Sequence, residues 1–241
     1  MSASQGRVIA GITLRATLGR KRALLFGITP LILIGVTVAL QLAHPEHANW
    51  QAAILGLFGF TVVLPLTALL IGTSVLGAEI DDGSIIHLLA TPVARPLVIA
   101  AKYAVAAVLT MIFAGLPELV AGLIAATPRQ AVGLFVGVLA GSLMYNAVFL
   151  MISVLSTRAI AFGLLYALIW EGLLGNLVPG ARLLSVGQYS LGIANSIAHE
   201  PGLTAALGLS TAVIMGAAVT AITLVIAARR LASFTIKGEP A

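Results

Sequence analysis

The sequence contains few charged residues and no cysteine. Charged residues make up only 9% of the 241 positions, hydrophobic residues make up 60%, and the mean hydropathy is +1.10. A soluble domain carries about a quarter charged residues, because water must be met over most of its surface. This composition excludes a water-soluble globular protein and indicates an integral membrane protein. Without cysteine, disulfide bonds and thiolate metal sites are excluded as well.

The chain also lacks motifs for nucleotide binding and for catalysis within the membrane. A P-loop needs Gly-Lys followed by Ser or Thr, and none of the lysines follows a glycine. All histidines lie outside the apolar segments, which excludes a serine–histidine protease site in the membrane, and no His-Glu-x-x-His zinc motif occurs. We therefore expect no catalytic residue, no metal site and no cofactor bound by this chain.

Six apolar segments are long enough to cross a membrane, since a helical crossing takes about 20 residues. They are residues 23–42, 52–77, 97–127, 131–155, 159–179 and 203–228. The fifth is interrupted by Glu171. The sequence thus predicts an all-α integral membrane protein whose single domain, residues 23–228, is a bundle of six transmembrane helices.

The distribution of lysine and arginine predicts the orientation of this bundle. Eleven of the 13 basic residues fall on the side that holds both termini, and only Arg129 and Arg182 fall on the other. Because basic loops remain in the cytoplasm, both termini are expected inside the cell membrane, and residues 43–51, 126–130 and 180–202 outside. The basic residues behind the net charge of +5 lie at the ends of apolar segments rather than in one patch, so no nucleic-acid partner is expected.

Three segments are predicted not to span the membrane. Residues 1–22 are expected to form an interfacial helix, although a disordered basic tail is the alternative. Residues 180–202 are expected to form an outer re-entrant or interfacial segment, and residues 229–241 a cytoplasmic tail. In the N-terminal segment, helical spacing separates an apolar group from a basic group: Val8, Ile9, Ile12 and Ala16 against Arg7, Arg15 and Arg22.

The cytoplasmic segment 79–102 is the most informative stretch of the sequence. Acidic residues at its start can cap a helix, and the Thr91–Pro92 pair ends it. The resulting two-turn helix has Ile85, Leu88 and Leu89 on one face. Exposed apolar side chains on a cytoplasmic loop indicate a partner surface, although packing beneath the chain's own bundle is the alternative.

This segment resembles that of the ABC-2 type permeases, the membrane subunits of ATP-binding-cassette exporters. Their pattern is an acidic residue, a Gly-Ser/Thr turn, a Leu-Leu-Ala-x-Pro-x-x-Arg run and a following lysine. The matching positions are Glu79, Gly83, Ser84, Leu88, Leu89, Ala90, Pro92, Arg95 and Lys102. A second patch, Trp170 through Asn176 to Ser185 and Tyr189, is also similar to family members. With the six predicted spans, the resemblance covers nearly the whole chain.

The resemblance implies partners and a coupling role. It implies two copies of a separate ATPase subunit, which would bind ATP and Mg, and a second permease copy or a paralogue in the membrane. It also implies that the loop 79–96 contacts the ATPase and transmits its movement. The residues assigned to this coupling are Glu79, Asp82, Gly83, Ile85, Leu88, Leu89, Pro92 and Arg95.

Polar residues inside the spans are candidates for a substrate path or gate. A charge at the membrane centre costs at least about 2.5–3.5 kcal/mol, so Glu118 and Glu171 should face the bundle interior or a wet cavity. A satisfied structural carboxylate is the alternative for both. The candidate path or gate residues are Glu118, Asn146, Trp170, Glu171 and Asn176. Glycines at 133, 137 and 141 form a small face for helix packing, within one subunit or in a dimer.

The function expected from the sequence is export of a hydrophobic or amphiphilic substrate, such as a drug, natural product or lipid. Apolar spans without a charged binding site favour such a substrate over a metal or a sugar. A proton-coupled secondary transporter that uses Glu118 and Glu171 is the main alternative, and a non-transporting membrane scaffold is another. Co-purification with an ATPase subunit would separate these functions.

Overall fold

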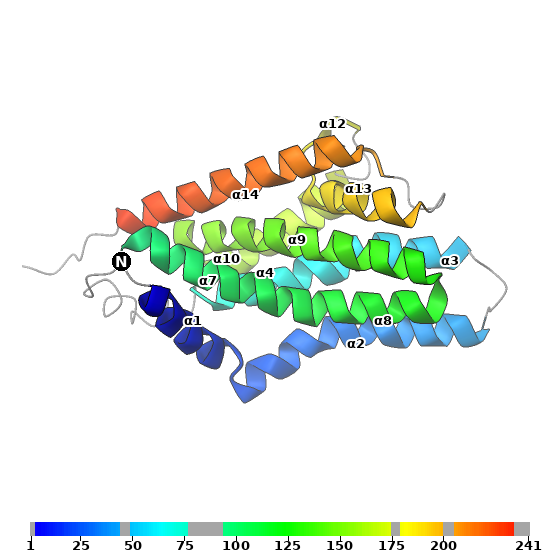
Figure 1. Cartoon of the computed structure of the whole chain (residues 1–241), viewed down its shortest axis with the longest axis horizontal. Helices are drawn as coiled ribbons and strands as arrows, with labels where there is room; N and C mark the ends of the chain where they lie inside the picture. The colour runs from blue at the N-terminus through cyan, green and yellow to red at the C-terminus, as the bar shows by residue number, and fades with distance from the viewer. Residues whose placement is uncertain (1–2, 44–48, 77–93, 175–178, 200–204, 234–241) are drawn as a thin grey trace, which may run out of the picture.

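The computed structural model describes residues 3–43, 49–76, 94–174, 179–199 and 205–233, which are helical along most of their length. The long helices lie side by side along one axis (Figure 1). Five of them are long and apolar enough to cross a membrane: Leu24–Ala43, Ala52–Ser74, Arg95–Ala125, Pro128–Leu155 and Leu209–Ala232. Each coincides with a predicted span to within a few residues, which confirms an all-helical membrane fold.

The first half of the chain contains two spans with a change of helix type. Its elements are α1 (Ala3–Thr17), α2 (Arg20–Ala43), α3 (Asn49–Gln51), η1 (Ala52–Val63), α4 (Leu64–Ser74), α7 (Arg95–Thr110), η2 (Met111–Gly115) and α8 (Leu116–Ala125). The segments η1 and η2 are π-helical, and Pro65 and Pro117 are the second residues of the α-helices that follow them, α4 and α8. Proline lacks an N–H and cannot continue the α-helical hydrogen bonds, so the looser π pattern precedes it.

The second half is built around one long central helix. Its elements are α9 (Pro128–Leu155), α10 (Ala159–Leu165), η3 (Tyr166–Leu174), α12 (Pro179–Arg182), α13 (Val186–Ala198) and α14 (Leu209–Ala232). Thr127 and Gln130 form a capping box at the start of α9, where Pro128 takes the first helical position. The helix α9 contacts α4, α8, α13 and α14, and it is therefore the scaffold of the bundle.

The predicted fifth crossing, at residues 159–179, is not confirmed by the described helices. The elements α10 and η3 form a shorter apolar helix, Ala159–Leu173, below the length of the other spans. Residues 175–178 lie outside the described part of the chain. The six-span count, like the cytoplasmic orientation, therefore stays a prediction.

Both described chain ends lie at one end of the bundle, as an even number of crossings requires. This terminal end holds α1, the start of α7 and the end of α14, whereas the turn between α8 and α9 lies at the opposite, turn end (Figure 1). In α1, Ile9 and Ala10 pack against the apolar core at the terminal end, but Val8 and Ile12 are 60% and 63% exposed. The predicted N-terminal helix is thus present, with its apolar side chains divided between two faces.

The helix α13 lies alongside α9 in the half of the bundle toward the turn end (Figure 1). A Cβ added to Gly133 would lie 2.6 Å from the backbone nitrogen of Ala198, and one added to Gly137 would lie 2.6 Å from Cβ of Ala194. Further along α9, one added to Gly141 would lie 2.5 Å from the Ser190 hydroxyl. The glycine face therefore receives a helix of the same chain. The prediction of an outer re-entrant or interfacial segment at residues 180–202 stays a prediction.

Candidate functional site

Glu171 lies at the N-terminus of α13. Its side chain is only 2% exposed, and its two carboxylate oxygens accept hydrogen bonds from the backbone N–H groups of Val186 at 2.9 Å and Gly187 at 3.1 Å. The first N–H groups of a helix have no partner within the helix, and they carry its positive partial charge. The Glu171 carboxylate on η3 therefore accepts hydrogen bonds from the N–H groups that α13 leaves without a partner at its start.

Two hydroxyl groups complete this arrangement. Tyr166 donates to Glu171 Oε1 at 2.8 Å, and Ser185 donates to Oε2 at 2.5 Å. The Ser185 oxygen also accepts from the Gln188 N–H at 3.1 Å, as a helix N-cap does. The geometry corresponds to a satisfied structural carboxylate, the alternative that the sequence left open for Glu171.

Trp170 of η3 binds the segment that leads into α13. Its indole Nε1 donates to the carbonyl oxygen of Leu184 at 3.2 Å, one residue before Ser185. The Tyr189 hydroxyl donates to the carbonyl of Leu183 at 2.6 Å. The candidate Asn176 lies outside the described residues. The tryptophan thus joins Glu171 in fastening η3 to the segment that precedes α13.

Glu118 has a different environment. Its side chain is 1% exposed in α8, and its Oε1 has no hydrogen-bond partner among the described residues. The carboxyl group packs against Gly59 of η1, where an added Cβ would lie 2.7 Å from Oε2. The two carboxyl groups that the sequence treated alike therefore differ: both oxygens of Glu171 accept hydrogen bonds, whereas Oε1 of Glu118 has no partner in the described part of the chain.

Asn146 lies in the interior of the bundle, between α9 and its neighbours. Its side chain is fully buried, and its amide Nδ2 donates to Thr110 Oγ1 at 2.8 Å and to the Ser142 carbonyl at 2.7 Å. A Cβ added to Gly72 of α4 would lie 3.1 Å from Asn146 Oδ1. The structure does not bring Asn146 together with either carboxyl group in any contact that it records.

The coupling loop lies almost entirely outside the described residues, but the helices that flank it, α4 and α7, are described. Those outside are Glu79, Asp82, Gly83, Ile85, Leu88, Leu89 and Pro92, whereas Arg95 is the first residue of α7. Lys102 on α7 is 1% exposed, and its Nζ donates to the carbonyl oxygen of Val75 at 2.6 Å. Val75 is the C-cap of α4, where helix carbonyls lack partners and carry negative partial charge.

The contact of Lys102 with the Val75 carbonyl could not be predicted from the spacing of residues in the sequence. The sequence included this lysine only as a match to a family pattern. One signal was available, because a lysine in an apolar segment requires a buried acceptor. The structure identifies that acceptor as the end of the preceding span.

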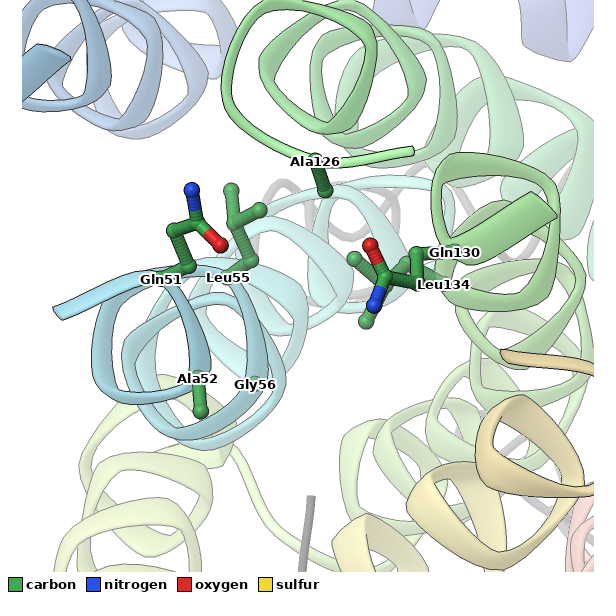
Figure 2. Close-up of a pocket in the computed structure, with 7 residues that line it drawn as sticks. All are labelled: Gln51, Ala52, Leu55, Gly56, Ala126, Gln130 and Leu134. Atoms are coloured by element: carbon green, nitrogen blue, oxygen red, sulfur yellow. The ribbon is translucent and has the colours of Figure 1, made fainter. Parts of the chain in front are cut away.

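A small pocket opens at the turn end of the bundle, between η1 and the α8–α9 turn. It is lined by Gln51, Ala52, Leu55, Gly56, Ala126, Gln130 and Leu134. Gln51 and Leu55 lie on one side and Gln130 and Leu134 on the other, with Ala126 over the gap (Figure 2). Its volume open to water is about 20 Å³. Within the described ranges, His, Asp and Glu side chains form no group of three that could hold a metal ion.

Comparison with known proteins identifies the family. The model of the ABC-2 family transporter proteins matches residues 18–178, which include four of the six predicted spans, nearly all of the fifth, the coupling loop and both buried glutamates. No curated protein matches the chain. ABC-2 permeases are the membrane components of ABC transporters; they lack an ATP-binding domain of their own and generally pair with an ATP-binding-cassette ATPase. Because the match covers more than half of its length, the chain belongs to the ABC-2 family of transporter proteins and is a multi-pass membrane protein.

Proposed function

We propose that the chain is the permease of an ABC exporter that moves a hydrophobic or amphiphilic substrate. The energy would come from ATP that a separate ATPase subunit binds with Mg and hydrolyses. Membership of the family and the absence of a Gly-Lys-Ser/Thr sequence in this chain support this division of labour.

The buried contact between Lys102 and Val75 is the observation that carries the proposal. It joins the end of α4 to α7, the two helices between which the coupling loop lies in the chain. An ammonium group removed from its acceptor in a buried site loses a charge-assisted hydrogen bond and remains desolvated. A force on the loop would therefore move α4 and α7 together rather than separate them.

The loop 79–96 would be the docking element for the ATPase. We assign the contact to the apolar face of Ile85, Leu88 and Leu89, with Glu79, Asp82, Gly83, Pro92 and Arg95 shaping and orienting the loop. Two ATPase subunits would dock on two permeases, either identical copies or paralogues, in the plasma membrane with both termini in the cytoplasm.

The chemistry of the spans favours an apolar substrate. Of the two glutamates within apolar segments, Glu171 is occupied by the N-terminus of α13, and Glu118 is enclosed by its own helices. Neither offers an open ionic site in the described structure. A drug, natural product or lipid can instead be accommodated between apolar helix faces, as efflux permeases of this kind require.

The test is ATP-dependent efflux from vesicles that contain the permease and its ATPase subunit. Leu89→Asp places a charge in a contact that would be desolvated, so ATPase association and efflux should both fall. Ser233→Asp places the same charge on the terminal end outside the loop and should leave both unchanged. Normal association and efflux in Leu89→Asp would refute the docking role. Efflux that does not depend on ATP and is abolished by an uncoupler of the proton gradient would favour the secondary transporter.

A further inference from the structure

A groove runs between α7 and α14 at the terminal end of the bundle, where the two helices lie side by side (Figure 1). Its volume is about 410 Å³, within the range of about 300–1,000 Å³ that is typical of pockets for small molecules. Ala100 of α7 and Ala228 of α14 contribute only methyl groups to its walls. Tyr103 follows Pro96, the lining residue nearest the start of α7, by seven residues, or about 10 Å along a helix. The groove therefore extends from the terminal end toward the middle of the bundle.

The walls of this groove are apolar, and one side of it is open. Apart from Tyr103 and Arg229, every side chain that lines it is aliphatic. The Tyr103 hydroxyl donates to the carbonyl oxygen of Leu143 on α9 at 3.2 Å, so it already has a partner within the bundle. Ala100 and Val225 are exposed, and both helices have the length and composition of membrane spans. The open side of the groove therefore faces the acyl chains of the bilayer.

Arg229 places a positive charge at the rim of the groove. It lies in the last turn of α14 and is exposed. Among the described residues, the structure records no ion pair or hydrogen bond of its guanidinium group. The two carboxyl groups in the described ranges are engaged elsewhere, because Glu171 accepts from the start of α13 and Glu118 packs against Gly59 of η1. An anion that belongs to another molecule can therefore bind Arg229.

Apolar walls with a cation at the rim favour one class of occupant. A guanidinium group forms paired hydrogen bonds with phosphate oxygens, and basic pockets between transmembrane helices at the cytoplasmic side bind anionic lipid headgroups. A free phosphate ion would use the charge but not the apolar walls, and a neutral hydrocarbon would use the walls but not the charge. A phosphatidylcholine headgroup would bring a second cation to the rim. An anionic phospholipid uses both features of the groove.

We propose that the groove between α7 and α14 binds an anionic phospholipid, with its phosphate on Arg229 and one acyl chain between the two helices. The proposal goes beyond ATP-driven export, because the lipid binds whether or not an ATPase subunit or an exported substrate is present. The bound lipid also contacts a helix that Lys102 joins to the end of α4.

Native mass spectrometry of the full chain tests the charge without any ATPase. The chain is released from micelles that contain equal amounts of phosphatidylglycerol and phosphatidylcholine with identical acyl chains. The ratio of bound phosphatidylglycerol to phosphatidylcholine should fall about fivefold in Arg229→Gln. It should stay unchanged in Arg230→Gln, because Arg230 does not line the groove. Helical circular dichroism and elution as a single species establish that each variant is folded. An unchanged ratio in Arg229→Gln, or an equal fall in both variants, would overturn the proposal.

Two alanines of α7 test the apolar part of the groove. Ala100 lines it, whereas Ala104 is exposed one turn further along and does not. Ala100→Leu should reduce bound phosphatidylglycerol several-fold, and Ala104→Leu should leave it unchanged. Equal retention in the two variants would refute an acyl chain in the groove, as would displacement of phosphatidylglycerol by glycerol 3-phosphate, which has the phosphate but no chain. If Ala100→Leu instead abolishes a dimer and retains the lipid, the groove binds a second copy of the chain and the proposal is wrong.

Discussion

Replacing Glu171 with leucine tests how the start of α13 is held inside the bundle. The substitution removes the acceptors of two backbone N–H groups and two hydroxyl groups. The hydroxyls of Tyr166 and Ser185 can rotate toward other acceptors, but the N–H groups of Val186 and Gly187 cannot. A buried donor left without a partner costs about 1–3 kcal/mol, so the two N–H groups predict a loss of about 2–6 kcal/mol.

Glutamine at the same position should cost less. Each carboxylate oxygen accepts one backbone N–H and one hydroxyl, and the amide keeps one of these oxygens. The amide NH₂ can donate to a hydroxyl but cannot accept from the second N–H. One unsatisfied N–H group remains, and Glu171→Gln should lose about 1–3 kcal/mol.

The assay is unfolding of the purified protein in mixed micelles of lipid and detergent, followed by circular dichroism. The free energy of unfolding should fall in the order wild type, Glu171→Gln, Glu171→Leu. Leu173→Ala, which shortens an exposed side chain two residues along η3, controls for a change in that helix. Surface substitutions usually change the free energy of unfolding by no more than about 0.5 kcal/mol. If the free energy of unfolding of Glu171→Leu lies within that range of the wild-type value, the carboxylate does not anchor α13.

Three further predictions use other parts of the chain. Lys102→Met should leave ATPase association intact but reduce efflux per ATP hydrolysed, because α4 and α7 lose their charge-assisted link; equal coupling ratios would contradict this. Gly133→Ala should destabilise the bundle by about 1–3 kcal/mol in the unfolding assay. Gly35→Ala, where an added Cβ meets no heavy atom within 4 Å, should not. A cysteine introduced at Asn49 should react with an impermeant reagent from outside the cell and one at Ser233 should not, and the reverse result would invert the orientation.

The sequence was sufficient to predict the parts of the fold that depend on local patterns. The lengths of apolar segments located five spans. The glycine spacing from 133 to 141 indicated a close helix approach. These features follow from composition and helical period, which a single segment carries by itself.

The position of α13 could not be predicted in the same way. The sequence predicted an outer re-entrant or interfacial segment at residues 180–202, but it did not indicate which helices α13 packs against. What holds it inside is a carboxylate fifteen residues earlier and a glycine face on another helix. Such long-range contacts leave no periodic pattern in a single sequence. The different hydrogen bonding of Glu118 and Glu171 could not be predicted for the same reason.

The short length of α13 also bears on how the protein is made. A helix of thirteen residues extends about 20 Å, less than the roughly 30 Å of hydrocarbon that a nascent segment must cross to be retained by itself. Its first N–H groups would lack their carboxylate acceptor until η3 presents Glu171, and the helix would lack its packing surface until α9 presents its glycine face. Because both precede α13 in the chain, the translating ribosome releases the acceptor before the donor. The helix can therefore pack into the bundle only after its receiving site has been made.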